Sequence, residues 1–146
     1  PMNGPAASGA EDLAPFLLHD NPQLQMETLK SLQRIGGKAR AAILMSVLPR
    51  ADDAFKLNIV ETLGSIKARE AVPVLAEMLQ AKTSAAAAMK ADLDEKICLA
   101  LGAIGSEDTL PALTEITKSR GFFSGRTYPE KVRLAAGKAV AAITRR

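Results

Sequence analysis

A four-residue pattern recurs along the chain. Leu63–Ile66 (Leu-Gly-Ser-Ile) returns as Leu101–Ile104 (Leu-Gly-Ala-Ile), and weaker copies end at Ile35 and Ile143. The four closing isoleucines are separated by 31, 38 and 39 residues. A period of this size is typical of one supersecondary unit stacked on copies of itself. The repeat therefore predicts a stacked architecture, and such stacks usually bind other molecules.

The spacing of apolar residues before each isoleucine indicates helices. An aliphatic residue stands three positions earlier in every copy, and a further face residue stands seven positions earlier. Offsets of three, four and seven fall on one face of an α-helix. We expect four second helices over 22–35, 53–66, 93–104 and 129–144. We expect four first helices over 11–19, 38–49, 69–81 and 107–119. This predicts an all-α chain of eight helices in four antiparallel pairs, without a strand signal.

Helix ends are marked by capping residues. Asn21 before Pro22 is a favourable start, and Gly36-Gly37 and Gly105 favour left-handed stops. Two pairs have capping-box spacing, Asp92 with Glu95 and Thr127 with Glu130. The run of alanines inside 82–91 predicts a helical extension or a short extra helix, or else a linker.

Proline and glycine recur at matching places in the units. Pro15, Pro73 and Pro111 fall several residues into the first helices, where proline predicts a kink. Gly64 and Gly102 fall inside second helices, where glycine costs about 1 kcal/mol against alanine. A cost that recurs at one place predicts that a neighbouring helix approaches closely there.

Proline early in the first helix, as in Val72–Leu75 and Leu110–Leu113, and a second helix ending in Leu-Gly-x-Ile resemble the HEAT repeat. The nearest variant is the short HEAT-like repeat named after phycobilisome lyases, and the resemblance covers about residues 11–145. It implies a right-handed, armadillo-like α-solenoid (an α-α superhelix) of about four two-helix repeats. It also implies a concave side lined by second helices, which in this family usually binds a protein and less often nucleic acid or a bilin.

Composition limits the other properties of the chain. Hydrophobic residues make up 47% of the chain, so we predict that residues 10–146 form one folded domain. Residues 1–9 are predicted to be a disordered tail outside the fold. The single cysteine excludes an intramolecular disulfide and fits a reducing compartment. No apolar run reaches the roughly 18 residues of a transmembrane segment, and no secretory signal is visible. We expect a cytoplasmic protein.

Residues for catalysis are sparse. His19 is the one histidine and is expected to close a helix end, and Cys98 is expected to be a small buried thiol. No cluster of metal ligands and no phosphate-binding loop is present, so we expect no enzyme activity and no cofactor. With one Tyr and no Trp, the chain offers little to stack on a tetrapyrrole, so a bilin-lyase-like function is the least favoured.

A first candidate surface lies on the second helices of the later units. Leu99 and Ala103, with the small residues that follow the same rows on the last helix, form a modestly apolar strip between Lys96 and Lys138. The strip is a candidate for binding an apolar helix or peptide of a partner. The equally weighted alternative is that these residues pack against neighbouring helices.

A second candidate surface is the segment 119–128. It contains three of the five aromatic residues of the chain together with arginine, the residue types enriched in interface hot spots. The candidate residues are Arg120, Phe122, Phe123, Arg126 and Tyr128. The alternative, which the sequence favours slightly, is that the phenyl rings cover the open end of the last helix pair.

Charge supports a second class of function. Residues 118–146 hold eight basic residues and one acidic residue, a net charge of +7, whereas residues 1–117 have a net charge of −4. A basic end suits nucleic acid or an anionic membrane surface. However, Lys131, Arg133 and Lys138 do not share one helix face. The sequence therefore favours a non-catalytic protein-interaction or scaffolding module, whose partner is another protein or a fused neighbouring domain, over a polyanion binder.

Overall fold

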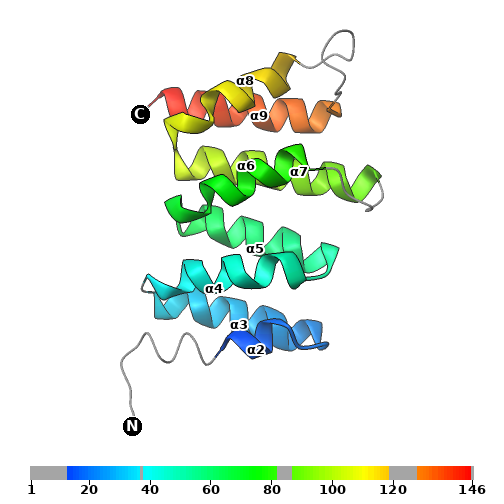
Figure 1. The fold of residues 1–146 in the computed structure, drawn as a ribbon, viewed down its shortest axis with the longest axis vertical. Coiled ribbons are helices and arrows are strands. Elements are labelled where there is room, and N and C mark those ends of the chain that lie inside the picture. Colours follow the sequence, from blue (N-terminus) through cyan, green and yellow to red (C-terminus); the bar gives the residue numbers. More distant parts are fainter. Residues whose placement is uncertain (1–12, 37, 82–86, 119–127, 146) are drawn as a thin grey trace.

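The computed structural model describes residues 13–36, 38–81, 87–118 and 128–145. In these ranges the chain forms eight α-helices, three short 3₁₀ turns and no strand. The helices are stacked along the long axis, with α2 and α3 at one end and α8 and α9 at the other (Figure 1). The predicted all-α solenoid is confirmed.

The two kinds of helix alternate along the chain. The second helices are α3 (Pro22–Ile35), α5 (Asp53–Ser65), α7 (Ala87–Ile104) and α9 (Glu130–Thr144). The first helices are α2 (Ala14–Leu17), α4 (Ala39–Val47), α6 (Val72–Gln80) and α8 (Leu110–Lys118). The 3₁₀ turns are η1 (Leu48–Arg50), η2 (Arg69–Ala71) and η3 (Glu107–Thr109). Most predicted ends agree within one to three residues.

Several predicted helix ends are confirmed. Asn21 Oδ1 accepts hydrogen bonds from the backbone N–H groups of Gln23, at 2.9 Å, and Leu24, at 3.3 Å. Gly36 and Gly105, which follow α3 and α7, have positive φ of 75° and 82°, a backbone conformation that glycine adopts readily. His19 Nδ1 accepts the N–H of Asn21 at 3.1 Å, so the histidine stabilises the turn between α2 and α3.

The start of α7 differs from the prediction. In the described residues the helix runs from Ala87 to Ile104, so the predicted capping box at Asp92 and Glu95 is wrong, because both residues lie inside the helix. The physical reason is the alanine-rich sequence upstream, which continues the helix toward its N-terminus. The helical extension predicted in this insertion is thus confirmed for residues 87–91. Thr127, of the other predicted box, lies outside the described residues.

The prolines start helices instead of kinking them. Pro15, Pro73 and Pro111 are each the second residue of an α-helix, and η2 and η3 precede the last two. In the first turn a backbone N–H has no acceptor within the helix, so a proline costs nothing there. The predicted bend in the helix interior is therefore wrong. The residues before each later proline form a 3₁₀ turn that leads into the α-helix.

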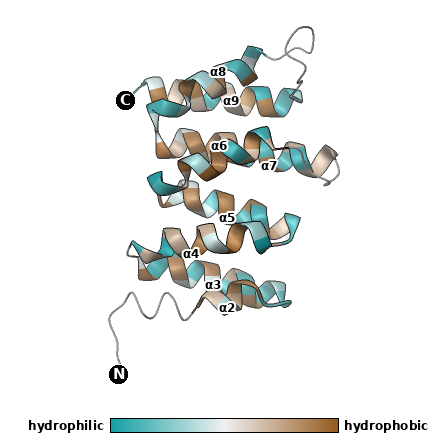
Figure 2. Cartoon of the chain, in the orientation of Figure 1, coloured by the Kyte–Doolittle hydropathy of each residue, from teal (hydrophilic) through white to brown (hydrophobic). Residues whose placement is uncertain are grey.

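Apolar side chains from every helix form one core. Figure 2 shows hydrophobic residues on each helix of the stack, alternating with hydrophilic ones. The largest fully buried side chains are Leu17, Leu32, Leu44, Leu48, Ile59, Leu63, Leu75, Leu79, Ile97, Leu101, Ile104 and Leu113. No helix in the described ranges is both long and apolar enough to cross a membrane.

Successive second helices meet at one repeated register. In each seam, the residue two positions before the closing isoleucine of one unit faces a residue of the next unit. That second residue lies four positions before the closing isoleucine of its own unit. A Cβ on Gly64 would stand 2.8 Å from Ala100 Cα, and one on Gly102 would stand 2.8 Å from Ala139 Cα. The predicted close approach is therefore confirmed. At the seam between α3 and α5, Gln33 Nε2 instead donates a hydrogen bond to Thr62 Oγ1 at 3.1 Å.

Candidate functional site

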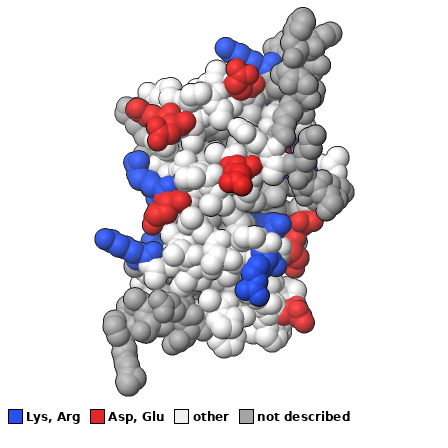
Figure 3. All heavy atoms as spheres, in the orientation of Figure 1, with Lys and Arg blue, Asp and Glu red and all other residues white. Residues whose placement is uncertain are grey.

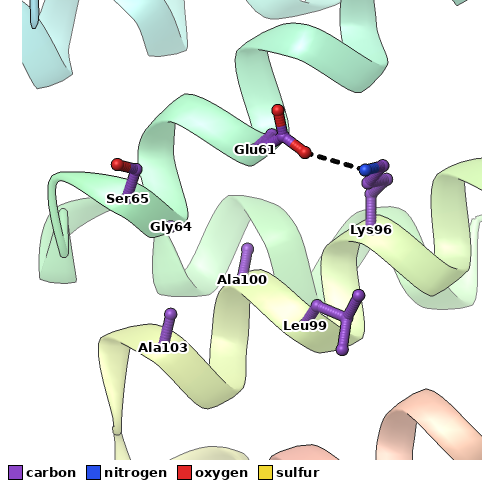
Figure 4. Close-up of a pocket in the computed structure, with 7 residues that line it drawn as sticks. All are labelled: Glu61, Gly64, Ser65, Lys96, Leu99, Ala100 and Ala103. Carbon is purple, nitrogen blue, oxygen red and sulfur yellow. Dashed lines mark hydrogen bonds and ion pairs between the residues drawn. The ribbon is translucent and has the colours of Figure 1, made fainter.

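A shallow groove lies where α5 and α7 meet. Its volume is about 260 Å³, and Figure 4 shows its lining. The residues that line it are Glu61, Gly64, Ser65, Lys96, Leu99, Ala100 and Ala103. Most of them are small or apolar, and the two charged side chains lie together at one end of the groove (Figure 4).

The groove follows from the glycine in the repeat. Because Gly64 has no side chain, the α7 backbone at Ala100 comes into direct contact with α5. Leu99 and Ala103 flank this contact on α7, and both are exposed. Leu99 retains 41% of its surface exposed, although few large apolar side chains in the described ranges do so. The seam therefore presents an apolar edge to solvent.

One ion pair joins the two sides of the groove. Lys96 Nζ on α7 donates to Glu61 Oε2 on α5 at 2.8 Å (Figure 4). Both side chains are substantially exposed, so the pair adds about 1 kcal/mol or less to the stability. Its atoms remain accessible, and a charged group of a ligand can exchange with either partner.

The structure brings together three of the nine predicted site residues, Lys96, Leu99 and Ala103. Lys138 is exposed on α9 and does not line this groove. Four predicted residues lie outside the described residues: Arg120, Phe122, Phe123 and Arg126. The prediction missed the contribution of α5, whose Glu61 and Ser65 occupy the matching exposed rows of the preceding unit.

Tyr128, the remaining predicted residue, packs against the core. Its hydroxyl donates to the carbonyl oxygen of Leu79 at 3.1 Å, and its side chain is half-buried. Lys90 Nζ reaches the same carbonyl oxygen at 3.5 Å and that of Met78 at 3.0 Å. Both contacts supply donors to carbonyl groups at the C-terminal end of α6, where a helix lacks them.

The Lys90 ammonium also pairs with a buried carboxylate. Lys90 Nζ lies 2.6 Å from Asp94 Oδ1, and the Asp94 side chain is almost fully buried. Burial, and after it the carboxylates of Asp94 and Glu95, raise the pKa of the Cys98 thiol from 9.0 to about 12. Cys98 is therefore a protonated thiol at neutral pH, as expected for a buried cysteine. Across the described residues, no group of three or more His, Cys, Asp or Glu side chains is placed to hold a metal ion.

Three basic residues near the C-terminal end, Lys131, Arg133 and Arg145, make contacts within the fold. Lys131 pairs with Asp92 of α7, and the hydrogen bond between them raises the pKa of the Lys131 ammonium. Arg133 Nη1 donates to the Tyr128 carbonyl oxygen at 2.6 Å, and Arg145 Nε donates to that of Ala141 at 3.2 Å. Figure 3 shows basic and acidic side chains interspersed over the face in view. These contacts leave fewer cations to bind a polyanion.

A second groove, of about 300 Å³, lies on the first-helix side of the stack and was not predicted. It is lined by Leu48, Pro49, Lys56, Val74, Glu77, Met78 and Ala81. The residues come from η1, α5 and α6, with Ala81 just after α6. No pattern in the sequence marks this groove, because its lining is shared by two neighbouring units of the repeat.

Comparison with known proteins agrees with this geometry. The family of HEAT repeats matches residues 10–93 and again residues 43–121, which together cover most of the chain. The chain belongs to the HEAT-repeat family. No curated protein matches this HEAT-repeat chain in sequence.

A solved structure of similar fold is that of human deoxyhypusine hydroxylase in complex with glycerol. The TM-score is 0.76 at 19% sequence identity, and the match covers 95% of this HEAT-repeat chain. The chain spans 44% of that structure's chain. At this identity the likeness shows the shared helical stack, and no activity is carried over.

Proposed function

We propose that this HEAT-repeat chain is a non-catalytic protein-binding module, and that the groove between α5 and α7 holds an amphipathic helix of its partner. The observation that carries the proposal is the exposed Leu99 beside the Gly64–Ala100 contact. HEAT-repeat stacks commonly bind proteins, which agrees with this role. An apolar groove with a small-residue floor suits one row of apolar side chains from a helix.

The charges around the groove specify the partner further. Lys96 stands at one end of the strip, and Lys138 is exposed on the next second helix in the row that contains Leu99. Cations on both sides of an apolar strip favour a partner helix whose apolar residues are flanked by acidic residues. Glu61 opposes this preference in part, since it already pairs with Lys96. The apolar contact with Leu99 is therefore the main source of affinity, and the charges select the partner.

The alternative functions receive less support. A polyanion would need free cations in a continuous stripe, whereas Lys131, Arg133 and Arg145 have partners within the fold. A bilin would need aromatic side chains for stacking, and none lines the groove. The proposal is one of binding, and it assigns no reaction to the chain.

The test uses a displayed library of amphipathic helical peptides with acidic flanks. Peptides are selected on the wild-type chain, and their affinity is then measured on Leu99→Asp and on the control Ile35→Asp. Ile35 is 43% exposed on α3, so it matches Leu99 in exposure but lies outside the groove. A new carboxylate in an apolar contact should weaken binding about tenfold or more.

We expect the loss of affinity for Leu99→Asp alone. We also expect amide chemical-shift changes confined to α5 and α7 when a selected peptide is titrated into the labelled protein. Peptides that bind both variants as well as wild type would refute the groove as the binding site, provided that circular dichroism shows both variants to be folded.

A further inference from the structure

In the part of the chain that the structure describes, α9 is the last helix of the stack and carries an exposed face. Ala141 of α9 stands two before Ile143, the place that Gly64 and Gly102 hold in the earlier units. In those units this place contacts the next second helix, but Ala141 is exposed. Leu134, on the same helix, is 60% exposed, the largest value among the exposed large hydrophobic residues of the described ranges. An added Cβ on Gly137 would meet no atom within 4 Å.

The internal seams define what a helix on this face must carry. Across the seam between α5 and α7, the small residue two before one isoleucine contacts the small residue four before the next. At the same seam, Glu61 pairs with Lys96. Glu61 lies five positions before the closing isoleucine of its unit, and Lys96 lies eight positions before that of the next unit. A helix on the exposed face of α9 should therefore offer a small residue to Ala141 and an acidic residue to Lys138.

The helix α3, which is the second helix of the first unit, carries a small residue and an acidic residue at the required positions. Ser31 of α3 stands four before Ile35, and Glu27 stands eight before it. Glu27 is exposed and Ser31 is half-buried. The two helices lie at opposite ends of the stack (Figure 1), so neither can satisfy the other within one molecule. The register that joins neighbouring units thus also matches the C-terminal end of one molecule to the N-terminal end of another.

We propose that this chain associates head to tail, with α9 of one copy packing on α3 of a second copy. Ala141 then lies against Ser31, Lys138 pairs with Glu27, and Leu134 is removed from water. The opposite charges of Lys138 on α9 and Glu27 on α3 favour this orientation. Because the two contacting surfaces differ, the association is heterologous and extends into linear oligomers.

The test is sedimentation velocity over micromolar to millimolar protein. We expect wild type to form dimers and longer oligomers as its concentration rises, and added salt to weaken them. Ala141→Arg places a large charged side chain in the close contact and should weaken association about a hundredfold. Lys138→Glu or Glu27→Lys alone creates a like-charge pair and should weaken association about fivefold to tenfold.

Charge reversal on both surfaces gives the sharpest result. The double variant Lys138→Glu/Glu27→Lys should regain the wild-type association. An equal mixture of the two single variants should also associate, because each joint formed between unlike copies pairs opposite charges. A two-fold symmetric dimer, a wild type that stays monomeric at every concentration, or a double variant that fails to recover would each overturn the proposal. Circular dichroism of every variant checks that the fold is retained.

Discussion

Gly64 lies so close to α7 that a Cβ at this position would stand 2.8 Å from Ala100 Cα and 2.9 Å from Ala100 Cβ. The same relationship joins Gly102 to Ala139 one unit later. The obstructing atoms belong to the backbone and to a Cβ, so they cannot move aside as the end of a flexible side chain can. Two consecutive seams therefore depend on the absence of one methyl group.

Gly64→Ala and Gly102→Ala should each destabilise the fold by about 2 kcal/mol, because the added methyl group overpacks the seam. This is opposite to the usual effect of alanine in a helix. The control is Gly137→Ala in α9, where an added Cβ has open space around it, and which should stabilise the fold by about 0.5–1 kcal/mol. Urea unfolding of the three variants measures the differences. A stabilising Gly64→Ala would contradict the close contact.

Two lysines of α7 form ion pairs that differ in burial, which predicts different costs of removal. Lys90→Met takes the ammonium from the buried Asp94 carboxylate and from two α6 carbonyl groups, and should cost about 3 kcal/mol. Lys96→Met breaks an exposed pair and should cost about 1 kcal/mol or less. The two unfolding free energies are measured in parallel in guanidinium chloride. Equal costs would show that the burial of Asp94 contributes nothing.

The buried Cys98 thiol predicts a dependence of stability on high pH. Its pKa in the folded chain is about 12, above the ordinary value of 9.0. A raised pKa means that the unfolded chain loses the proton first, so stability is retained below pH 9 and falls as pH rises toward 12. Between pH 9 and 11 the thiol should account for a loss of about 2 kcal/mol.

The measurement compares wild type with Cys98→Ala in urea at both pH values. The variant should lose less stability than wild type over this interval, since the alanine does not titrate. In addition, a thiol reagent should modify native Cys98 at pH 8 only at the rate of unfolding. Rapid modification of the native chain would contradict the burial of the thiol.

Tyr128→Phe should destabilise the fold by about 1 kcal/mol. The variant keeps the ring but removes the hydroxyl that donates to the Leu79 carbonyl oxygen. Tyr128→Leu, which also removes the ring packed against the core, should cost more. Thermal unfolding followed by circular dichroism compares the two variants. A Tyr128→Phe variant as stable as wild type would mean that the hydrogen bond makes no net contribution to the stability of the fold.

The repeat made the stack and its seams predictable, whereas the groove was predictable only in part. A helical glycine that recurs at one register needs a structural reason, and the contacts of Gly64 and Gly102 provide it. The prediction followed one row of residues along the later helices and so found Leu99 and Ala103. The groove instead crosses a seam, and its other side comes from Glu61 and Ser65 of the preceding unit.

Prediction from local sequence also failed where two sequence signals favour different structures. Asp92 with Glu95 has the spacing of a helix start, but the alanines upstream favour helix more strongly, and Asp92 serves as the partner of Lys131. From the sequence alone, the prolines are equally compatible with a kink inside a helix and with a position in its first turn. Only the 3₁₀ turns before Pro73 and Pro111 decide between them. The Tyr128–Leu79 hydrogen bond joins residues too far apart in the chain for any pattern to reveal.

The seam between α3 and α5 makes the mechanics of the stack uneven. Here Gln33 and Thr62 span the gap with a side-chain hydrogen bond, whereas the two later seams are closed by backbone in contact with backbone. Water can replace the Gln33 amide on Thr62, but it cannot enter the later seams without parting the helices. Under tension or torsion applied to the two ends, we therefore expect the strain to concentrate at this first seam, with the other three units moving as one rigid body.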